Sequence, residues 1–326
     1  MKEREKMLIL IILAALYMGW SMGANDAANC VGANIGSGMM SVKTGIIITC
    51  FFSFLGAVLF GGNVIKTIGD GVVSLKSLGQ SRIDLIALSS LFSSALWVTV
   101  ATYKKFPVST SHSIVGAVAG GGMALSTPIH WNKIGDIALC WIVTPVGSCI
   151  FAILLYYILR FLFEIPYIRQ RRKNLARALI YVTSAYLAFM WGANDVANAT
   201  GILYGTQRFT TFNAALLGAL AIIVGTVTWG YRVIETVGFN IVNITPVMSI
   251  AIVIATALNI QIYTHYGIPV STSHSIVGSV WGAGIIQGIK TMNMKLARDI
   301  VLTWALTPLV SGGITFILTK TILFLR

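Results

Sequence analysis

Charged side chains are scarce in this sequence. Asp, Glu, Lys and Arg make up only 10% of its 326 residues and apolar residues make up 56%, whereas soluble domains carry about 25% charged residues. This deficit excludes a soluble globular domain. It predicts an all-α polytopic membrane protein, because the apolar runs are continuous and do not alternate as they would in a barrel. The clearest runs are residues 44–63, 84–103, 137–160, 210–229 and 299–325.

Acidic residues are especially few, and the formal net charge is +13. No basic stripe is interleaved with aromatic residues, so we expect no nucleic acid partner. Under the positive-inside rule, the most cationic segment is a cytoplasmic loop of a multi-pass protein in the cell membrane, and both termini are then extracytoplasmic. A role of this segment in lipid binding is the alternative. Its cations are Arg160, Arg169, Arg171, Arg172, Lys173 and Arg177.

The few cysteines lack the spacing of a metal site or a redox pair. All of them lie in or beside apolar segments, so we interpret them as small core residues, and we expect no cofactor. They are Cys30, Cys50, Cys140 and Cys149.

Two polar motifs occur twice in the chain. Gly23–Asn29 recurs as Gly192–Asn198, with six of seven positions identical. Pro107–Gly116 recurs as Pro269–Gly278, with all ten positions identical. The order of the motifs is kept and their separations are nearly equal, so the chain is an internal duplication of one module that fills about half of the sequence.

The duplication divides the chain into a first transmembrane repeat (1–163), a basic cytoplasmic linker (164–177) and a second transmembrane repeat (178–326). Internal repeats in a polytopic membrane protein usually indicate a transporter, since two copies inserted in opposite orientation supply the two conformations of alternating access. We therefore predict two inverted-topology repeats, with the binding site between them near the middle of the membrane.

The second motif places four hydroxyls within five residues after a proline. Pro107 disfavours helix before it and suits the first turn of a helix after it, so the hydroxyls are predicted to lie at a helix start inside the membrane. Free backbone N–H groups and the helix dipole make such a start an anion site, and two starts facing each other would cradle a tetrahedral oxyanion. Ordinary helix capping is the alternative. The hydroxyl residues are Ser109, Thr110, Ser111 and Ser113, with Ser271, Thr272, Ser273 and Ser275 in the second copy.

The first motif puts a carboxylate and two carboxamides inside an apolar segment, where an ionisable side chain usually marks a functional site. We expect Gly23 and Gly192 to break their helices, so that freed backbone carbonyls join the side-chain oxygens around a hard cation such as sodium. Protonation of the carboxylate is the competing way to neutralise it, and a buried hydrogen-bonded network is a further alternative. The candidate sodium ligands are Asn25, Asp26, Asn194 and Asp195, with Asn29 and Asn198 as weaker candidates.

The paired Gly-Ala-Asn-Asp and Pro-Val-Ser-Thr-Ser-His motifs, one pair in each half, resemble those of the inorganic phosphate transporter (PiT) family over nearly the whole chain. The resemblance implies phosphate transport driven by sodium or, in many bacterial members, by protons or metal-phosphate complexes. It implies about twelve helical elements with re-entrant helical hairpins at the serine motifs and, often, a homodimer. The serine motifs become the phosphate side and the first motif becomes the cation side. We prefer sodium, because amide oxygens suit a metal ion and do nothing for a proton.

One inference concerns the choice between phosphate and sulfate. Near neutral pH phosphate carries a proton and sulfate does not. A site built to accept that O–H group discriminates strongly against an analogue that lacks it. We hypothesise that Asp26 or Asp195 accepts it and thereby rejects sulfate.

Two other classes of function fit parts of the sequence. An intramembrane hydrolase would use Ser, His and Asp, but Ser-x-x-His is not a known catalytic spacing, and an enzyme has no use for two complete copies. A passive anion channel would need a polar stripe along several spans. The role of His112 and His274 stays open between a proton relay and a neutral ring that fixes the hairpin by a hydrogen bond. Two further repeated pairs, interpreted as packing and a kink, are Trp141 with Pro145 and Trp304 with Pro308.

Overall fold

The computed structural model describes residues 2–75, 78–105, 108–231, 233, 244–288 and 293–325, and Pro107 of the first serine motif lies outside them. Within the described residues the chain forms twelve helices and no sheet. Among the described residues, β-type pairing is limited to an isolated bridge between Val73 and Ile129. The predicted all-α architecture of about twelve elements is confirmed.

Eight helices are long and apolar enough to cross a membrane, namely α1, α2, α4, α6, α8, α9, α11 and α13. Their outward side chains are apolar: Ile142 of α6 is 68% exposed and Leu309 of α13 is 71% exposed. Such a surface suits contact with lipid rather than water, so this is a multi-pass membrane protein. The helices are α1 (Lys2–Gly36), α2 (Val42–Phe60), α3 (Gly62–Gly71), α4 (Gln80–Tyr103), α5 (Thr110–Ala124), α6 (Trp131–Glu164), α7 (Pro166–Gln170), α8 (Arg172–Gly205), α9 (Thr211–Trp229), α11 (Pro246–His265), α12 (Thr272–Gln287) and α13 (Met294–Phe324).

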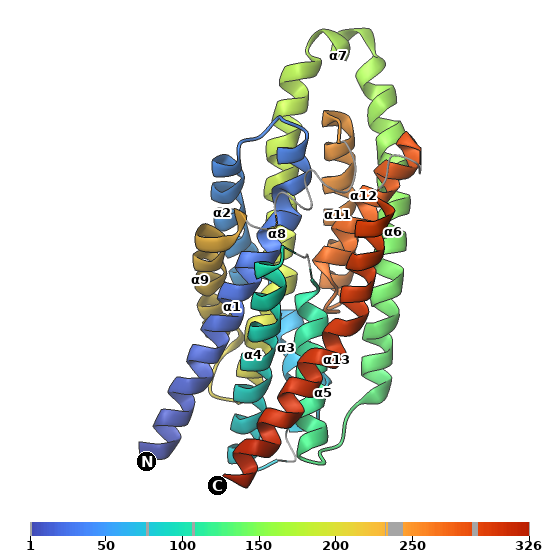
Figure 1. Cartoon of the computed structure of the whole chain (residues 1–326). Coiled ribbons are helices and arrows are strands. Elements are labelled where there is room, and N and C mark those ends of the chain that lie inside the picture. The colour runs from blue at the N-terminus through green and yellow to red at the C-terminus, as the bar shows by residue number, and fades with distance from the viewer. Residues whose placement is uncertain are drawn as a thin grey trace.

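Both chain termini lie at one end of the molecule, and α7 lies at the opposite end (Figure 1). The linker predicted over 164–177 holds the end of α6, the short helix α7 and the start of α8. α1 runs from the terminal end toward the α7 end, whereas α8 runs in the opposite direction (Figure 1). These two helices carry the Gly-Ala-Asn-Asp motif. Opposite directions are what inverted repeats require of this pair, and the inverted topology of the complete repeats, with its hairpins, stays a prediction.

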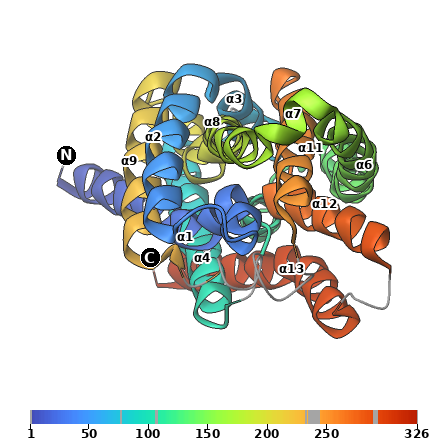
Figure 2. The same ribbon diagram turned by 90° about the horizontal axis from the view of Figure 1, so that it is seen from above.

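Helices from the two halves of the sequence pack against each other. α1 pairs with α9, and α2 pairs with α8; α5 pairs with α13, and α12 pairs with α6. Seen from above, α2 and α9 lie together on one side of α8, and α6, α11 and α12 lie on the other side (Figure 2). The division at 164–177 therefore describes the order of the sequence and does not separate two independently packed domains.

The predicted helix breaks at Gly23 and Gly192 are wrong, because α1 and α8 run through both residues without interruption. Each glycine instead lets a neighbouring helix approach closely. A Cβ on Gly23 would lie 2.1 Å from the carbonyl oxygen of Ile222 in α9, and one on Gly192 would lie 2.0 Å from that of Ser53 in α2. Unbroken helices also keep the backbone hydrogen-bonded at membrane depth, where unpaired groups are costly. The motif therefore offers side-chain oxygens to a ligand, and not freed backbone carbonyls.

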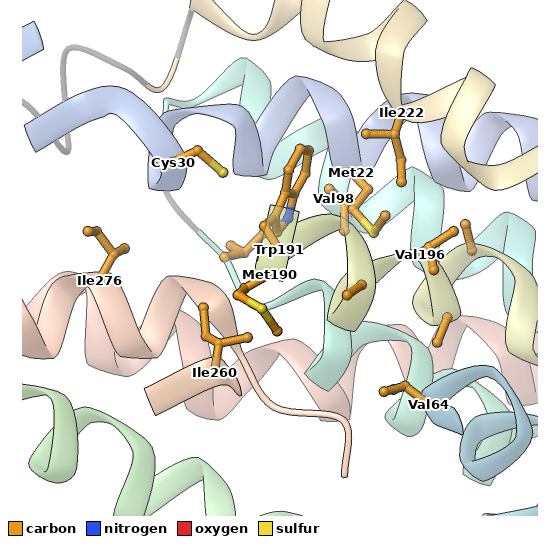
Figure 3. Close-up of a cluster of buried hydrophobic side chains, with 14 of the residues drawn as sticks. Met22, Cys30, Val64, Val98, Met190, Trp191, Val196, Ile222, Ile260 and Ile276 are labelled. Atoms are coloured by element: carbon orange, nitrogen blue, oxygen red, sulfur yellow. The ribbon is translucent and has the colours of Figure 1, made fainter. Parts of the chain in front are cut away.

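An apolar core encloses the middle of α1 and α8. Trp191 is fully buried there beside Met190, and Met22 and Val98 belong to the same cluster (Figure 3). Cys30 is also buried in this core, as predicted, whereas the other three cysteines are only half-buried. Surroundings of such low polarity strengthen electrostatic interactions and raise the cost of any unpaired charge. The polar motifs therefore lie where each charge and each dipole has a large effect.

Candidate functional site

Both serine motifs begin a helix, as the sequence predicts. Ser109 caps α5 by accepting a 3.1 Å hydrogen bond from the backbone N–H of His112, and Ser271 caps α12 by accepting a 3.2 Å bond from that of His274. α5 and α12 contain 15 and 16 residues. They are therefore about 22–24 Å long, too short for a hydrocarbon layer of about 30 Å. α5 lies toward the terminal end of the molecule and α12 toward the α7 end (Figure 1), so both begin near its middle.

The two helix starts contact each other. Ser111 Oγ donates a 3.0 Å hydrogen bond to the carbonyl of Val270, which precedes α12, and Ser273 Oγ donates a 2.8 Å bond to the carbonyl of Val108, which precedes α5. Each serine thus satisfies the backbone that leads into the other helix. This reciprocal pair brings the N-terminal ends of two helix dipoles to one place, and such ends favour an anion.

Asp26 in α1 lies against both helix starts. Its Oδ1 accepts a hydrogen bond from Asn29 Nδ2 at 2.9 Å, and its Oδ2 accepts one from Thr110 Oγ1 at 2.9 Å. Ser273 Oγ lies 3.1 Å from Oδ1, so the carboxylate shares the single hydroxyl proton of this serine with the carbonyl of Val108. The residue is 1% exposed. Among the described residues, the ion pairs lie elsewhere. A buried carboxylate that only neutral groups contact carries an uncompensated charge when it is ionised, and that charge is costly in apolar surroundings.

Asp195 in α8 has fewer partners than its counterpart in α1. Its Oδ2 accepts a 2.7 Å hydrogen bond from Thr272 Oγ1. Its Oδ1 is buried without a hydrogen bond of ordinary geometry among the described residues, and the indole N–H of Trp191, which also lacks such a bond, is a neighbouring donor to this carboxylate. The neighbouring Asn198 donates to Thr110 Oγ1 at 3.2 Å and to Ser111 Oγ at 3.1 Å. The second copy of the Gly-Ala-Asn-Asp motif therefore contacts the first copy of the serine motif, so both halves of the chain contribute to one centre.

Three buried oxygens at this centre have no hydrogen-bond partner in the part of the chain that the structure describes: Asp195 Oδ1, Asn29 Oδ1 and Asn198 Oδ1. Buried polar atoms are nearly always hydrogen-bonded, so each exception calls for an explanation. Carboxylate and amide oxygens are the ligands of hard cations. The three residues are no more than 1% exposed, so the centre is closed to both faces of the protein.

Asn25 and Asn194 hold the segments that precede the serine helices. Asn25 Oδ1 accepts a 3.1 Å hydrogen bond from the backbone N–H of Val108, and Asn194 Oδ1 accepts a 3.3 Å bond from that of Val270. Both side chains therefore make well-defined structural bonds in the two halves. Their amide nitrogens donate, at 2.9 Å in each half, to the hydroxyls of Thr102 and Thr264.

The eight hydroxyl residues predicted to bind phosphate fall into three groups. Thr110, Ser111, Thr272 and Ser273 gather at the aspartates and asparagines of the centre. Ser109 and Ser271 cap their helices. The remaining two contact neighbouring helices instead: Ser113 accepts a 2.8 Å bond from Ser94, and Ser275 shares a 2.6 Å bond with Ser148.

Some residues of structural importance were not found from the sequence. Thr264 follows Thr102 by the same number of residues that separates the two serine motifs, so an alignment of the two repeats would have indicated this pair. Asp84 in α4 is also buried, and its Oδ2 lies 2.9 Å from Arg208 Nη2. The residue that corresponds to Asp84 in the second repeat is Pro246, so an alignment of the repeats would not have indicated the pair of Asp84 and Arg208.

Comparison with known proteins gives consistent matches over the whole chain. A sequence profile of the phosphate transporter family matches residues 22–177 and 163–315. A Haemophilus influenzae protein with the provisional name phosphate permease is 29% identical over 381 residues, covering 89% of this chain and 90% of its own. A Pyrococcus abyssi protein with the same provisional name is 28% identical over 398 residues, covering 98% of each chain. A solved structure titled as the sodium-dependent phosphate transporter has the same fold, with a TM-score of 0.87 at 24% identity, covering 98% of this chain and 100% of that one.

Proposed function

Because the chain belongs to the phosphate transporter family, we propose that it imports inorganic phosphate together with sodium ions by alternating access. Both substrates bind where α1, α5, α8 and α12 meet. The family consists of transporters, which excludes the intramembrane hydrolase considered from the sequence. The likeness to the fold of a sodium-dependent phosphate transporter supports the choice of sodium.

Phosphate binds at the paired starts of α5 and α12. The four hydroxyls of Thr110, Ser111, Thr272 and Ser273 now donate to carboxylates and to backbone carbonyls. A hydroxyl can rotate about its C–O bond, so the same groups can turn their O–H toward the oxygens of a phosphate. Backbone N–H groups at the two helix starts supply further donors, and both dipoles favour the negative charge.

The observation that carries the proposal is the set of unpartnered oxygens on Asp195, Asn29 and Asn198. Two buried carboxylates and a phosphate anion at one centre need positive charge, and the described ion pairs of Lys and Arg lie elsewhere. Sodium ions bound to these oxygens supply that charge. Protonation would neutralise a carboxylate, but it would leave the two amide oxygens unpaired, which is why we favour sodium over protons or a metal-phosphate complex. The geometry also favours Asn29 and Asn198 over Asn25 and Asn194 as ligands, because the oxygens of the latter pair accept backbone hydrogen bonds.

Transport requires that the centre open alternately to each face of the membrane. The structure has it closed, with Asp26 and Asp195 each 1% exposed. The opposite directions of α1 and α8 support an inverted pair of repeats that rock about the centre. We place the protein in the cell membrane with the α7 linker on the cytoplasmic side and both termini outside. A homodimer in the bilayer is part of the same proposal.

Uptake of radiolabelled phosphate into proteoliposomes tests this function. The purified protein is reconstituted into vesicles that contain potassium, and the outside buffer holds sodium or choline at the same ionic strength. We expect phosphate to accumulate above its outside concentration only with the inward sodium gradient. Accumulation driven by an inward proton gradient in choline would indicate proton coupling, and dependence on added magnesium would indicate a metal-phosphate substrate. Equilibration without any gradient would indicate a passive channel.

A further inference from the structure

One proline inside each of two long helices leaves a backbone carbonyl without its helical partner. Pro308 lies inside α13 and Pro145 lies inside α6. Proline has no backbone N–H, so the carbonyls four residues earlier, those of Trp304 and Trp141, receive no hydrogen bond within their own helix. At membrane depth such a carbonyl needs a partner from elsewhere in the protein.

The histidines of the two serine motifs meet these carbonyls. His112 Nδ1 lies 3.2 Å from the carbonyl oxygen of Trp304, and His274 Nδ1 lies 2.9 Å from that of Trp141. A carbonyl can only accept, so Nδ1 of each ring carries a proton and donates it. The histidine in each half of the sequence therefore replaces the N–H that proline removed from a helix in the other half.

Ring contacts join the same residues a second time. His112 lies 3.7 Å from Trp141 and His274 lies 3.7 Å from Trp304, measured between ring centroids, and the two histidine rings are 4.4 Å apart. Each histidine thus donates to the backbone of one tryptophan and packs on the ring of the other. The four side chains link α5, α6, α12 and α13 at the level of the serine motifs.

The backbones of the short helices also touch the prolines. A Cβ on Gly116 of α5 would lie 2.3 Å from the carbonyl oxygen of Pro308, and one on Gly278 of α12 would lie 2.2 Å from that of Pro145. Only glycine permits this approach. Each short helix therefore rests directly on the proline-containing turn of the helix whose carbonyl its histidine contacts.

We propose that His112 and His274 are positioning residues that hold the first turns of α5 and α12 on the proline-containing turns of α13 and α6. This inference rests on the proposed function, because His112 follows directly after Thr110 and Ser111, two of the hydroxyls assigned to phosphate. The crossed bonds fix the two helix starts relative to each other, and so fix the spacing of the donors around the anion. A pre-arranged set of donors binds its ligand without the entropic cost of ordering them.

A proton relay through the same rings has no route in this structure. Nε2 of both histidines is buried and has no hydrogen-bond partner among the described residues. The hydrogen-bonded protons of the two rings point to backbone carbonyls and not to Asp26 or Asp195. The positions of the rings therefore support a role in holding the helices in place.

A suppressor experiment tests the proposal. His112→Leu removes the donor and leaves the Trp304 carbonyl unpaired, whereas His112→Leu with Pro308→Ala restores a backbone N–H to the same carbonyl. Because an unpaired buried acceptor is costly, we expect KM for phosphate to rise about tenfold or more in the single variant. In the double variant KM should return to within about threefold of the wild-type value. His112→Asn keeps a nitrogen donor at the position of Nδ1 and should retain most of the affinity.

The control pairs His112→Leu with Pro145→Ala, which supplies an N–H to the wrong carbonyl and should give no rescue. A KM that stays at the wild-type value in His112→Leu, with only the amount of folded protein reduced, would show that the histidine stabilises the fold without positioning the donors. Equal rescue by Pro308→Ala and Pro145→Ala would overturn the pairing of each histidine with one proline-freed carbonyl.

Failure of the proposed function can be separated from failure of this inference. If the wild-type protein takes up no phosphate, the transport proposal fails. The pairing is still tested by the thermal stability of the same variants in detergent, where the two substitutions should be more strongly non-additive for His112 with Pro308 than for His112 with Pro145, which are coupled only through the rings of Trp141 and His274. Additive effects for both pairs would contradict the pairing whatever the protein transports.

Discussion

Thr272 Oγ1 donates a 2.7 Å hydrogen bond to Oδ2 of Asp195, and the other oxygen of that carboxylate makes no hydrogen bond of ordinary geometry in the described part of the chain. Its counterpart Asp26 accepts hydrogen bonds from three side chains, with both oxygens occupied. The two copies of the motif are therefore nearly identical in sequence and different in their bonding. We therefore expect the two aspartates to have different roles at the centre.

Substitution of each aspartate by asparagine should separate those roles. Asparagine at 195 can still accept the bond from Thr272 with its remaining oxygen, so Asp195→Asn should fold with near wild-type stability. It loses the charged oxygen assigned to sodium, so we expect the sodium concentration for half-maximal phosphate uptake to rise about tenfold or more, equivalent to about 1.4 kcal/mol. The measurement is phosphate uptake into proteoliposomes across a series of sodium concentrations.

Asp26→Asn should also reduce stability, because the NH2 group of the new asparagine faces a side chain that now donates a hydrogen bond to Asp26. Thermal unfolding in detergent should show a lower midpoint for Asp26→Asn than for Asp195→Asn. Unchanged sodium dependence in Asp195→Asn, or equal unfolding midpoints for the two variants, would contradict the assignment.

Rejection of sulfate should depend on the unpartnered oxygen of Asp195. A carboxylate oxygen has more than one lone pair, so the oxygen that contacts sodium can also accept the O–H of a protonated phosphate, whereas with sulfate it would face a bare oxygen. In the wild-type protein we expect a thousandfold excess of sulfate to leave phosphate uptake unchanged, since sites that hydrogen-bond a substrate O–H reject analogues lacking it by about 10⁴ or more. In Asp195→Asn the side chain gains N–H donors, and sulfate should then compete. The assay is run at saturating sodium, so that weaker sodium binding does not mask the result. Continued indifference of Asp195→Asn to sulfate would contradict its assignment to this oxygen, and indifference of both Asp195→Asn and Asp26→Asn would refute the hypothesis.

The helices were predictable where one kind of side chain dominates a long segment. The apolar runs at 84–103 and 210–229 correspond closely to α4 (Gln80–Tyr103) and α9 (Thr211–Trp229). The serine motifs were correctly placed at helix starts because proline and hydroxyl residues act locally. In each case the signal and its structural consequence lie within a few residues of each other.

The prediction failed where a residue acts through a partner far away in the sequence. Gly23 permits either a helix break or a close contact, and only the position of α9 shows that the contact is what it provides. Likewise, Pro308 predicted a kink, but nothing in the sequence indicates that His112 meets the carbonyl this proline leaves unpaired. The order of preference among the asparagines as ligands also depends on bonds to Val108 and Val270 that no sequence pattern reveals.

The close helix contacts at the motif glycines should not tolerate alanine. Alanine favours a helix over glycine by about 1 kcal/mol, so any loss of stability in Gly23→Ala or Gly192→Ala must come from the clash of the new Cβ with a backbone carbonyl. Overpacking of this kind costs about 1–3 kcal/mol or more, and we expect a lower thermal midpoint and less folded protein. The matched controls are Gly135→Ala in α6 and Gly313→Ala in α13, where a Cβ meets nothing within 4 Å among the described residues. The controls should be neutral or slightly stabilising, and equal losses at all four sites would contradict the packing role.

The ion pair between Asp84 and Arg208 should stabilise the start of α4 against the segment that follows α8. The side chain of Asp84 is 5% exposed and that of Arg208 is 23% exposed, and Gln80 Nε2 also donates a 3.0 Å bond to Asp84 Oδ1. Arg208→Met would leave a buried charge without its cation, which costs more than removing both charges together. We expect the thermal midpoint to fall in Arg208→Met and to recover at least half of that loss in Asp84→Asn with Arg208→Met. An equal midpoint in the single and double variants would show that the pair contributes nothing beyond the hydrogen bond from Gln80.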